Sequence, residues 1–562
     1  MFTKTHYWLA LALVGVTALL YVGVRDHEYL SWDDDVFVQS NPHLQPPSWE
    51  SVRTLWTAPY AHLYVPVPYT VWVGLAHAFG GAGPGGTWQV PPGPLHLASA
   101  ACHALNVLLA FGLLRLLTRR DWGAAVGALL FAVHPMQVES VAWISELKDL
   151  LSGTFSLATL WLYLAWCGES QPGGQRRRWL LYGAATLAFA LALLSKPNTV
   201  ALPLVAGLLA TVLLRRTPRR AATSLVPWVA VAVAYAVFTR HVQPVAAELN
   251  IPLWQRLFVA GDALAFYMAK VLLPLQLAAD YGRTPQFVLQ SPWVHVVWLV
   301  PAAVITAAVA ARCRWPWVLA GVGAFCLALL PALGLTSFDF QQYSTVADHY
   351  AYVAMLGPAL LVASFLSRPR RFLAYGLCGI ALMLLALQSS LQVLYWKDNL
   401  SFWQHTLEVN PRSWLAHNNL GATYQRAARP TEAIRHYQQG LKLKPDDADM
   451  LINLGLSLYT ARRDQEALPY LERGLWLRPG DPRAHYLAGV ILLQARRATE
   501  ALPHFAAVLN GQPDEVNARL GLAKSLQALG RREEAAAQLR TIVDARPDFT
   551  AAGRELRALQ GR

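Results

Sequence analysis

Three consecutive carboxylates, Asp33, Asp34 and Asp35, directly follow Trp32 near the start of the chain. Like charges side by side repel each other, so such residues have raised pKa values unless a cation or hydrogen-bond donors share them. Carboxylates in that situation could transfer protons or hold a cation, because perturbed pKa values cluster at functional sites. A solvated loop that tolerates charge is the alternative interpretation, and the triplet alone does not exclude it.

Further ionisable and polar residues stand beside apolar stretches farther along the chain. They are His134, Glu139, Glu146, Lys148, Asp149, Lys196, Arg283, His349 and Tyr350. An ionisable residue at membrane depth is costly, which makes each one a functional hypothesis. Lys196 and Arg283 could instead simply extend to the membrane interface. Glu139 follows a helix-breaking His-Pro pair and needs a partner if it lies near the hydrocarbon.

The composition predicts a membrane protein. Mean hydropathy is +0.30 and only 14% of the residues are charged, which is too apolar for an ordinary soluble protein. The net charge of +13 comes from arginine clusters between apolar runs. This pattern follows the positive-inside rule and argues against nucleic-acid binding. The five cysteines form no CxxC pair, so no disulfide framework or zinc site can be assembled from them.

The first 395 residues contain a series of apolar segments expected to cross the membrane. The first, 7–24, is too long for a signal-peptide core and lacks a cleavage pattern, so it should remain as a span. The others are 95–117, 122–133, 150–166, 179–194, 198–214, 225–239, 256–273, 294–311, 318–335, 350–365 and 373–395. The arginine clusters all lie on the cytoplasmic side only if 225–273 crosses once in net terms. The expectation is about eleven spans.

That orientation places the N-terminus in the cytoplasm and the C-terminal tail on the other side of the membrane. The acidic triplet and the other candidate residues then occupy loops on the non-cytoplasmic side. Richness in arginine and alanine together with compact loops favours a bacterial inner membrane with a periplasmic tail. An endoplasmic reticulum membrane with a lumenal tail is the alternative.

The tail has a repeat of 34 residues. Proline recurs at that step at positions 411, 445, 479, 513 and 547, and a small residue recurs at 421, 455, 489 and 523. This is the period of tetratricopeptide repeats, which stack as pairs of helices into a solenoid. We therefore expect an all-α chain with a polytopic membrane domain over 1–395 and a solenoid over 396–562. The solenoid should comprise a partial repeat (396–411), four repeats (412–547) and a capping helix (548–562).

The order of motifs resembles a known family. The acidic motif from Trp32 is followed by His134-Pro135 with Glu139, then by Asp149-Leu150-Leu151-Ser152, Ser195-Lys196 and His349-Tyr350-Ala351-Tyr352, and finally by the repeats. This order is similar to that of the transmembrane and tetratricopeptide repeat-containing O-mannosyltransferases (the TMTC family) and their bacterial relatives. Two positions differ from the pattern of that family: His349 stands where an arginine is expected, and the acidic motif is a triplet instead of a pair.

The resemblance implies a GT-C glycosyltransferase fold that uses a polyprenyl-phosphate-linked, mannose-like sugar as donor. The acceptor would be a Ser or Thr hydroxyl of a protein on the non-cytoplasmic face, docked by the solenoid. Asp34, with Asp33 as the next candidate, is expected to take the hydroxyl proton as the oxygen attacks the anomeric carbon. Asp35 would position the loop.

The substrate-binding set completes this expectation. Negative charge near the sugar would stabilise an oxocarbenium-like transition state, and Glu139 is expected to orient the acceptor or the sugar. The departing lipid phosphate needs cationic partners, which Lys196, Arg283 or His349 could supply. His134, Asp149 and Tyr350 complete the set. Adjacent aspartates could also hold a divalent cation, although nothing in the spacing requires one.

Two other functions remain open at this level. The chain could be a non-enzymatic membrane scaffold whose repeats recruit envelope proteins. It could also be a ligase or flippase that acts on a lipid-linked glycan instead of a protein. The predicted inverting transferase rests partly on the family resemblance, and a fold alone does not determine a function.

Overall fold

The computed structural model describes residues 4–83, 86–168, 175–243, 251–368 and 372–560. The chain divides into two compact units, Met1–Pro411 and Arg412–Arg562, and each is described by itself. Nearly all regular structure in the described part is helical, as predicted. The exception is a two-stranded antiparallel pair formed by β1 (Gly81–Ala82) and β2 (Trp88–Gln89).

Helices occupy every segment of the first unit that was expected to span the membrane. They are α1 (Lys4–Tyr21), α4 (Pro92–Thr118), α5 (Asp121–Val133), α7 (Leu147–Gly168), α8 (Gln175–Leu193), α9 (Leu202–Val212), α10 (Pro218–Val242), α11 (Leu253–Leu272), α14 (Leu299–Ala310), α15 (Pro316–Leu329), α16 (Leu356–Leu366) and α17 (Phe372–Tyr395).

The predicted count of about eleven spans is not confirmed. Six helical segments in the described residues are long and apolar enough to cross a membrane, or seven if the bent pair Asp121–Val133 and Pro135–Ala142 is one span. A straight span needs about 20 apolar residues. The apolar helices Pro197–Val212, Pro316–Ala332 and Leu356–Leu366 are shorter than that. The apolar helices and their lengths still indicate an integral membrane protein.

Small residues allow close contact between helices of the first unit. A Cβ added to Gly127 on α5 would lie 2.5 Å from the carbonyl oxygen of Ala359 on α16, and one added to Gly357 on α16 would lie 2.4 Å from that of Gly321 on α15. Only glycine permits this approach of two backbones, as is common between helices in membranes.

The chain bends by 56° after α5, at His134-Pro135. Proline cannot continue a helix, because its ring clashes with the preceding turn and it has no N–H. The His134 side chain caps the next turn by accepting a hydrogen bond from the backbone N–H of Met136 at 3.3 Å. Short turns follow, namely η4 (Pro135–Gln137), α6 (Val138–Ala142) and η5 (Ile144–Glu146). They place Glu139, Glu146 and the start of α7 close together inside the unit.

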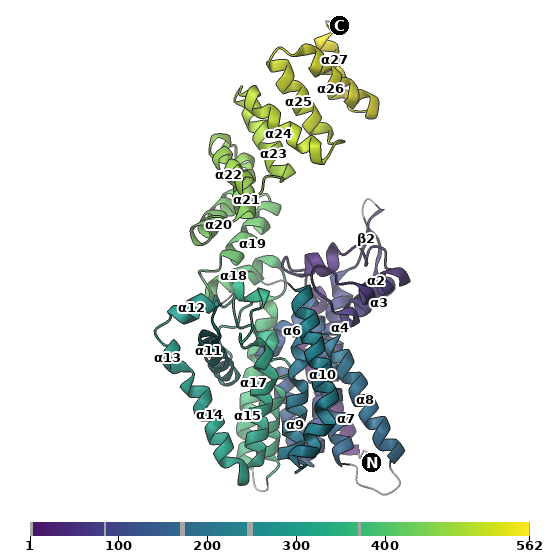
Figure 1. Cartoon of the computed structure of the whole chain (residues 1–562), viewed down its shortest axis with the longest axis vertical. Coiled ribbons are helices and arrows are strands. Elements are labelled where there is room, and N and C mark those ends of the chain that lie inside the picture. Colours follow the sequence, from purple (N-terminus) through teal and green to yellow (C-terminus); the bar gives the residue numbers. More distant parts are fainter. Residues whose placement is uncertain (1–3, 84–85, 169–174, 244–250, 369–371, 561–562) are drawn as a thin grey trace. The chain divides into compact units, whose positions relative to one another are not determined.

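Several short elements gather at one end of the first unit. Figure 1 shows α2 (Trp49–Thr57), α3 (Pro66–Phe79), α12 (Pro285–Gln290) and α18 (Asn399–Val409) at the end of the helical bundle opposite the N-terminus. The acidic triplet lies between η1 (Val22–Asp26) and α2, and residues 35–39 form the short element η2 (Asp35–Gln39). Helix α18, which was expected to open the solenoid, belongs to the first unit.

The second unit is a series of antiparallel helix pairs. Its helices are α19 (Trp414–Arg426), α20 (Pro430–Leu443), α21 (Ala448–Thr460), α22 (Asp464–Leu477), α23 (Pro482–Gln494), α24 (Ala498–Gly511), α25 (Val516–Ala528), α26 (Arg532–Ala545) and α27 (Thr550–Leu559). In each pair the second helix ends within two residues of the recurring proline, as predicted. Gly421 lies under the ring of Tyr437, where an added Cβ would be 2.6 Å from the ring. Four helix pairs, from α19 and α20 to α25 and α26, are thus followed by the single helix α27 in the described part of this unit.

Candidate active site

Asp34 holds the acidic triplet in place. Its side chain is fully buried. One carboxylate oxygen accepts hydrogen bonds from the backbone N–H of Ser145 at 3.0 Å and from the Ser145 hydroxyl at 2.5 Å, and the other accepts from the N–H of Leu30 at 3.0 Å. Three donors occupy this carboxylate, which therefore joins the triplet to the turn before α7. It is poorly placed to accept a proton from a substrate.

Asp33 is the more accessible carboxylate. Its side chain is 31% exposed, and its Oδ2 accepts a hydrogen bond from Lys148 Nζ at 3.5 Å. Lys148 also lies 3.1 Å from Glu146 Oε1. Its ammonium is 5.3 Å from the ring of Phe37 and 5.8 Å from that of Trp143. Asp33 is thus held by a long contact with Lys148, and part of its side chain remains exposed.

A second lysine continues the same cluster. Lys196 Nζ lies 3.0 Å from Glu146 Oε2 and 2.6 Å from Asp149 Oδ2, and all three side chains are at least nine-tenths buried. The ring of Tyr350 lies 5.5 Å from this ammonium. Asp33, Lys148, Glu146, Lys196 and Asp149 therefore form a continuous chain of alternating charge, which we call the lysine–carboxylate cluster.

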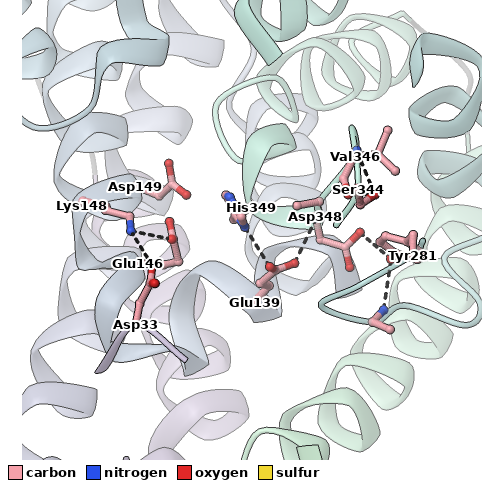
Figure 2. Close-up of polar contacts among 12 residues, drawn as sticks. Asp33, Glu139, Glu146, Lys148, Asp149, Tyr281, Ser344, Val346, Asp348 and His349 are labelled. Carbon is pink, nitrogen blue, oxygen red and sulfur yellow. Dashed lines mark hydrogen bonds and ion pairs between the residues drawn. The ribbon is translucent and has the colours of Figure 1, made fainter. Parts of the chain in front are cut away.

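A second group of polar side chains lies beside this cluster. Glu139 Oε1 is 2.8 Å from His349 Nδ1, and its Oε2 accepts from the N–H of Asp348 at 3.0 Å. The Tyr281 hydroxyl donates to Asp348 Oδ1 at 2.8 Å. In Figure 2, His349 stands between Glu139 and Asp149. The arrangement thus brings Glu139, Asp149, Lys196, His349 and Tyr350 together, although they come from distant parts of the sequence.

Burial governs the protonation of the groups that lie outside the helical spans. It raises the pKa of Asp33 against the opposing effect of Lys148. It also raises the pKa of Asp34 and of Asp348 to about 7 in each case. The pKa of His349 is lowered by burial to about 3, so this imidazole is neutral near pH 7. Its Nδ1–H then donates to Glu139, and its Nε2 is left as an acceptor.

A cavity of about 40 Å³ adjoins the cluster. Asp149, Ser152 and Ser156 line it from one face of α7, and His349, Tyr350 and Tyr352 line it from the loop before α16. The Ser156 hydroxyl is buried and has no hydrogen-bond partner among the described residues. The cavity is therefore polar, and it has room for small groups beside Asp149 and His349.

Glu146, Asp149 and His349 could in principle hold a metal ion. Each offers one ligand atom, and the three atoms lie within 4.8 Å of one another. Carboxylate oxygens with one imidazole suit several divalent cations. The Lys196 ammonium already lies against both carboxylates, so a metal ion would have to displace it. The lysine supplies the positive charge at this position.

The loop of the acidic triplet is also held from α18. The Asn399 side chain oxygen accepts from the N–H of Ser31 at 2.7 Å and from its hydroxyl at 2.6 Å, and the amide nitrogen donates to the carbonyl of Tyr29 at 3.0 Å. The Trp32 ring stacks against the rings of both Phe340 and Trp403, with ring centroids 5.7 and 5.4 Å away. Both contacts fix the residues immediately before Asp33.

Three predicted site residues lie apart from the cluster. The Nε2 of His134 contacts the carbonyl oxygen of Val271 at 3.1 Å, which fits a structural role at the bend. Arg283 forms a two-pronged ion pair with the buried Asp262, at 2.5 and 3.2 Å. Asp35 accepts a hydrogen bond from the N–H of Val36 within its own loop. None of these contacts involves Lys148 or Lys196.

Several residues of the site are absent from the substrate-binding set expected from the sequence. They are Glu146, Lys148, Asp348, Tyr281 and Asn399. Glu146 and Lys148 are visible in the sequence as charges beside the apolar run of α7, so their burial could have been anticipated. Nothing in the sequence pairs Asn399 with Ser31, because 368 residues separate them.

The comparisons with known proteins match both halves of the chain. Residues 92–243, which include most of the cluster, match the family of dolichyl-phosphate-mannose-protein mannosyltransferases. Residues 418–482 and 492–559 match tetratricopeptide repeat families.

Two curated relatives come from Drosophila melanogaster. Protein O-mannosyl-transferase Tmtc3 is 24% identical over 389 residues, which cover 58% of this chain and 41% of the relative. Protein O-mannosyl-transferase Tmtc2 is 30% identical over 117 residues, which cover 21% and 12%. The chain thus spans less than half the length of these relatives.

Among solved structures, MamA from Desulfovibrio magneticus is 23% identical over 26% of this chain and 84% of that chain, with a TM-score of 0.26. YrrB, described as a repeat protein with an unusual peptide-binding site, is 27% identical over 30% and 86%, with a TM-score of 0.27. By its family matches and its curated relatives, the chain combines a segment similar to mannosyltransferases with tetratricopeptide repeats and fits the TMTC-like family that its motifs predicted.

Proposed function

We propose that this protein is a membrane O-mannosyltransferase. It transfers a mannose-like sugar from a polyprenyl-phosphate donor to a Ser or Thr hydroxyl of a protein on the non-cytoplasmic face. The second unit docks the acceptor or a partner protein. The observation that carries the proposal is the lysine–carboxylate cluster, in which two buried ammonium groups from the segment similar to mannosyltransferases meet the more exposed carboxylate of Asp33.

Asp33 is the proposed general base. It is the more exposed of the two candidate aspartates, and burial raises its pKa toward the range in which a carboxylate exchanges protons readily. Asp34 has three donors on its carboxylate, so we assign it to positioning Asp33 instead. This reverses the order of preference that the sequence suggested.

Lys148 and Lys196 are the proposed partners of the donor phosphate. Lys148 pairs with Glu146, and Lys196 pairs with Asp149, which lines the cavity; a phosphate could replace these carboxylates as the acceptor. Cationic groups that meet a developing phosphate charge in a site shielded from water stabilise the transition state strongly. Arg283 is paired with Asp262 and is not assigned this role.

The proposed reaction is a single displacement. The acceptor oxygen forms a bond to the anomeric carbon while its proton passes to Asp33. The bond between that carbon and the phosphate oxygen breaks. The lipid phosphate keeps the electron pair and leaves beside Lys148 and Lys196. Because attack and departure take place on opposite faces of the sugar, the anomeric configuration is inverted.

The test is a transfer assay with purified protein in detergent or in membranes. Polyprenyl-phosphate mannose and a Ser/Thr-rich peptide serve as substrates, and product formation is followed by mass spectrometry. We expect wild-type protein to mannosylate the peptide and Asp33→Asn to lose on the order of 10² to 10⁴ in rate. Glu50→Gln, which alters an exposed acid on α2, is the matched control and should retain activity.

Three outcomes would count against the proposal. Full activity of Asp33→Asn would remove Asp33 as the base. No transfer by wild-type protein from any lipid-phosphate sugar would favour a non-enzymatic scaffold. Transfer to a lipid-linked glycan but not to the peptide would make the protein a glycan ligase.

A further inference from the structure

Two histidine pairs occupy equivalent positions in alternate repeats of the second unit. His417 on α19 faces His436 on α20 with 3.2 Å between their Nδ1 atoms. His485 on α23 faces His504 on α24 with 3.0 Å between the same atoms. Corresponding members of the two pairs are separated by two repeat lengths, and all four side chains are partly buried. The same local geometry is therefore built twice.

The other two repeats show that the helices pack without histidine at these positions. The second repeat has Leu451 and Tyr470, and the fourth has Arg519 and Gln538, whose side chains share a hydrogen bond of 2.9 Å. Histidine is thus not required by the crossing of the two helices in a repeat. Its presence on both helices in the first and third repeats needs another explanation.

The hydrogen bonds of His485 fix the protons of one pair. Its Nε2 lies 2.8 Å from the carbonyl oxygen of Pro479, which can only accept, so Nε2 carries the hydrogen. In a neutral ring Nδ1 is then unprotonated, and its lone pair points toward Nδ1 of His504. A histidine that binds a metal usually donates its other N–H to a carbonyl or carboxylate in this way.

The distances also suit a bound metal. Two imidazole nitrogens at 2.0–2.1 Å from a tetrahedral zinc ion lie about 3.3 Å from each other. The separations of 3.2 and 3.0 Å require an opening of only a few tenths of an ångström. A direct hydrogen bond between the rings gives similar distances, so the two explanations must be separated by experiment.

We propose that each histidine pair binds one divalent transition-metal ion, such as zinc, through its two Nδ1 atoms. Water completes the coordination. When the metal binds, the proton that His504 shares with His485 moves from Nδ1 to Nε2 of His504, so no net proton is released. The ion joins the two helices of one repeat.

Neighbouring acids are not assigned as ligands. Glu432 and Glu500 precede His436 and His504 by one helical turn, but each is bound by an arginine, Arg429 or Arg497. The same arginine–glutamate pair recurs in the repeats that lack the histidines, as Arg463–Glu466 and Arg531–Glu534. It therefore belongs to the helix pair in general and not to the metal site.

The test uses the full chain in detergent, stripped of metal with a chelator and titrated with zinc at near-neutral pH. Bound zinc is measured by equilibrium dialysis and elemental analysis. Each pair is replaced by the residues of the second repeat, as His417→Leu with His436→Tyr and as His485→Leu with His504→Tyr. Because the second repeat already accommodates this combination, the variants should fold. His77→Gln, at an exposed histidine on α3, is the control.

We expect each paired replacement to remove one bound zinc ion and both together to remove two, while the control removes none. Zinc should also raise the unfolding temperature of wild-type protein by more than that of the variant with all four substitutions (the fourfold variant). Equal zinc binding by the wild-type protein and the fourfold variant would overturn the proposal, and so would the loss of both ions from a single paired replacement. The first result would leave a direct hydrogen bond between the rings as the explanation.

Discussion

Replacing Lys196 with methionine should test whether the lysine–carboxylate cluster is connected as described. The ammonium is the shared partner of Glu146 at 3.0 Å and of Asp149 at 2.6 Å, in a place where the three side chains are at least nine-tenths buried. Removing one partner of a buried ion pair costs about 3–5 kcal/mol, because the remaining charge is left without compensation. We expect Lys196→Met to lower the free energy of unfolding by that amount.

The structure also predicts which second change restores stability. Glu146 keeps Lys148 at 3.1 Å when Lys196 is gone, whereas Asp149 forms an ion pair with no other lysine of the described residues. Asp149→Asn in the Lys196→Met background removes the uncompensated charge. The double variant should therefore be more stable than Lys196→Met alone, which is a strong departure from additivity.

Denaturant titration in detergent can measure these changes. The free cysteines, four of which are partly buried, provide the signal, because a thiol-reactive dye labels them as the first unit unfolds. Arg115→Met is the matched control. It breaks an ion pair with Asp121 of 2.9 Å whose side chains are about one-third exposed, so it should cost no more than about 1 kcal/mol. If Lys196→Met unfolds at the wild-type denaturant concentration, or if Asp149→Asn adds further instability to it, the described cluster is wrong.

Three further predictions concern pH, the triplet loop and the solenoid. The pKa of Asp34 and of Asp348 is about 7 in the folded state and ordinary in the unfolded state, so their contribution to stability is complete below about pH 4 and is lost as pH rises through about 7. The stability of wild-type protein relative to Asp34→Asn, in which the opposing effect of His349 cancels, should therefore fall between pH 5 and pH 8, and an equal difference at the two pH values would contradict the value for Asp34. Asn399→Ala removes three hydrogen bonds that hold the residues before Asp33, and it should lower kcat by a factor of up to about 10² with little change in donor KM. An unchanged kcat would show that the loop does not need these hydrogen bonds. Gly421→Ala places a Cβ 2.6 Å from the buried ring of Tyr437 on the facing helix, and it should lower the free energy of unfolding of the second unit by about 1–3 kcal/mol, measured by thermal unfolding. Unchanged stability would show that the two helices can move apart without cost.

The repeats were the part of the fold most open to prediction from sequence. A proline at a constant step marks the end of every second helix, and a small residue at a constant step marks each close crossing. Gly421 under Tyr437 shows why: the bulky ring fits only where the facing residue has no side chain. Such local, periodic constraints leave a direct trace in the sequence.

The membrane helices were predicted less completely. Each apolar segment is helical, but apolarity does not fix how far a helix extends. α9 and α16 have 11 residues each, and α5 ends at Val133, directly before the bend at His134-Pro135. Their lengths depend on tertiary packing, which the hydropathy of single segments does not contain.

The site itself shows both the value and the limit of residue types. The sequence singled out the acidic triplet and Lys196 because charge beside apolar runs is costly and needs a reason, and the structure brings Asp33 and Lys196 into one cluster. It could not rank Asp33 and Asp34, since that ranking depends on the donors Leu30 and Ser145, one of which lies 111 residues away. Arg283 likewise looked free until its pairing with Asp262 was known.

The central claim is that Asp33 performs the proton chemistry while the lysines hold the donor phosphate. The most direct test is a single-turnover measurement with polyprenyl-phosphate mannose bound at saturation and acceptor peptide then added to wild-type protein or Asp33→Asn. The account predicts that the variant still binds the donor but transfers the sugar on the order of 10² to 10⁴ times more slowly. Transfer at the wild-type rate from the bound donor would contradict it.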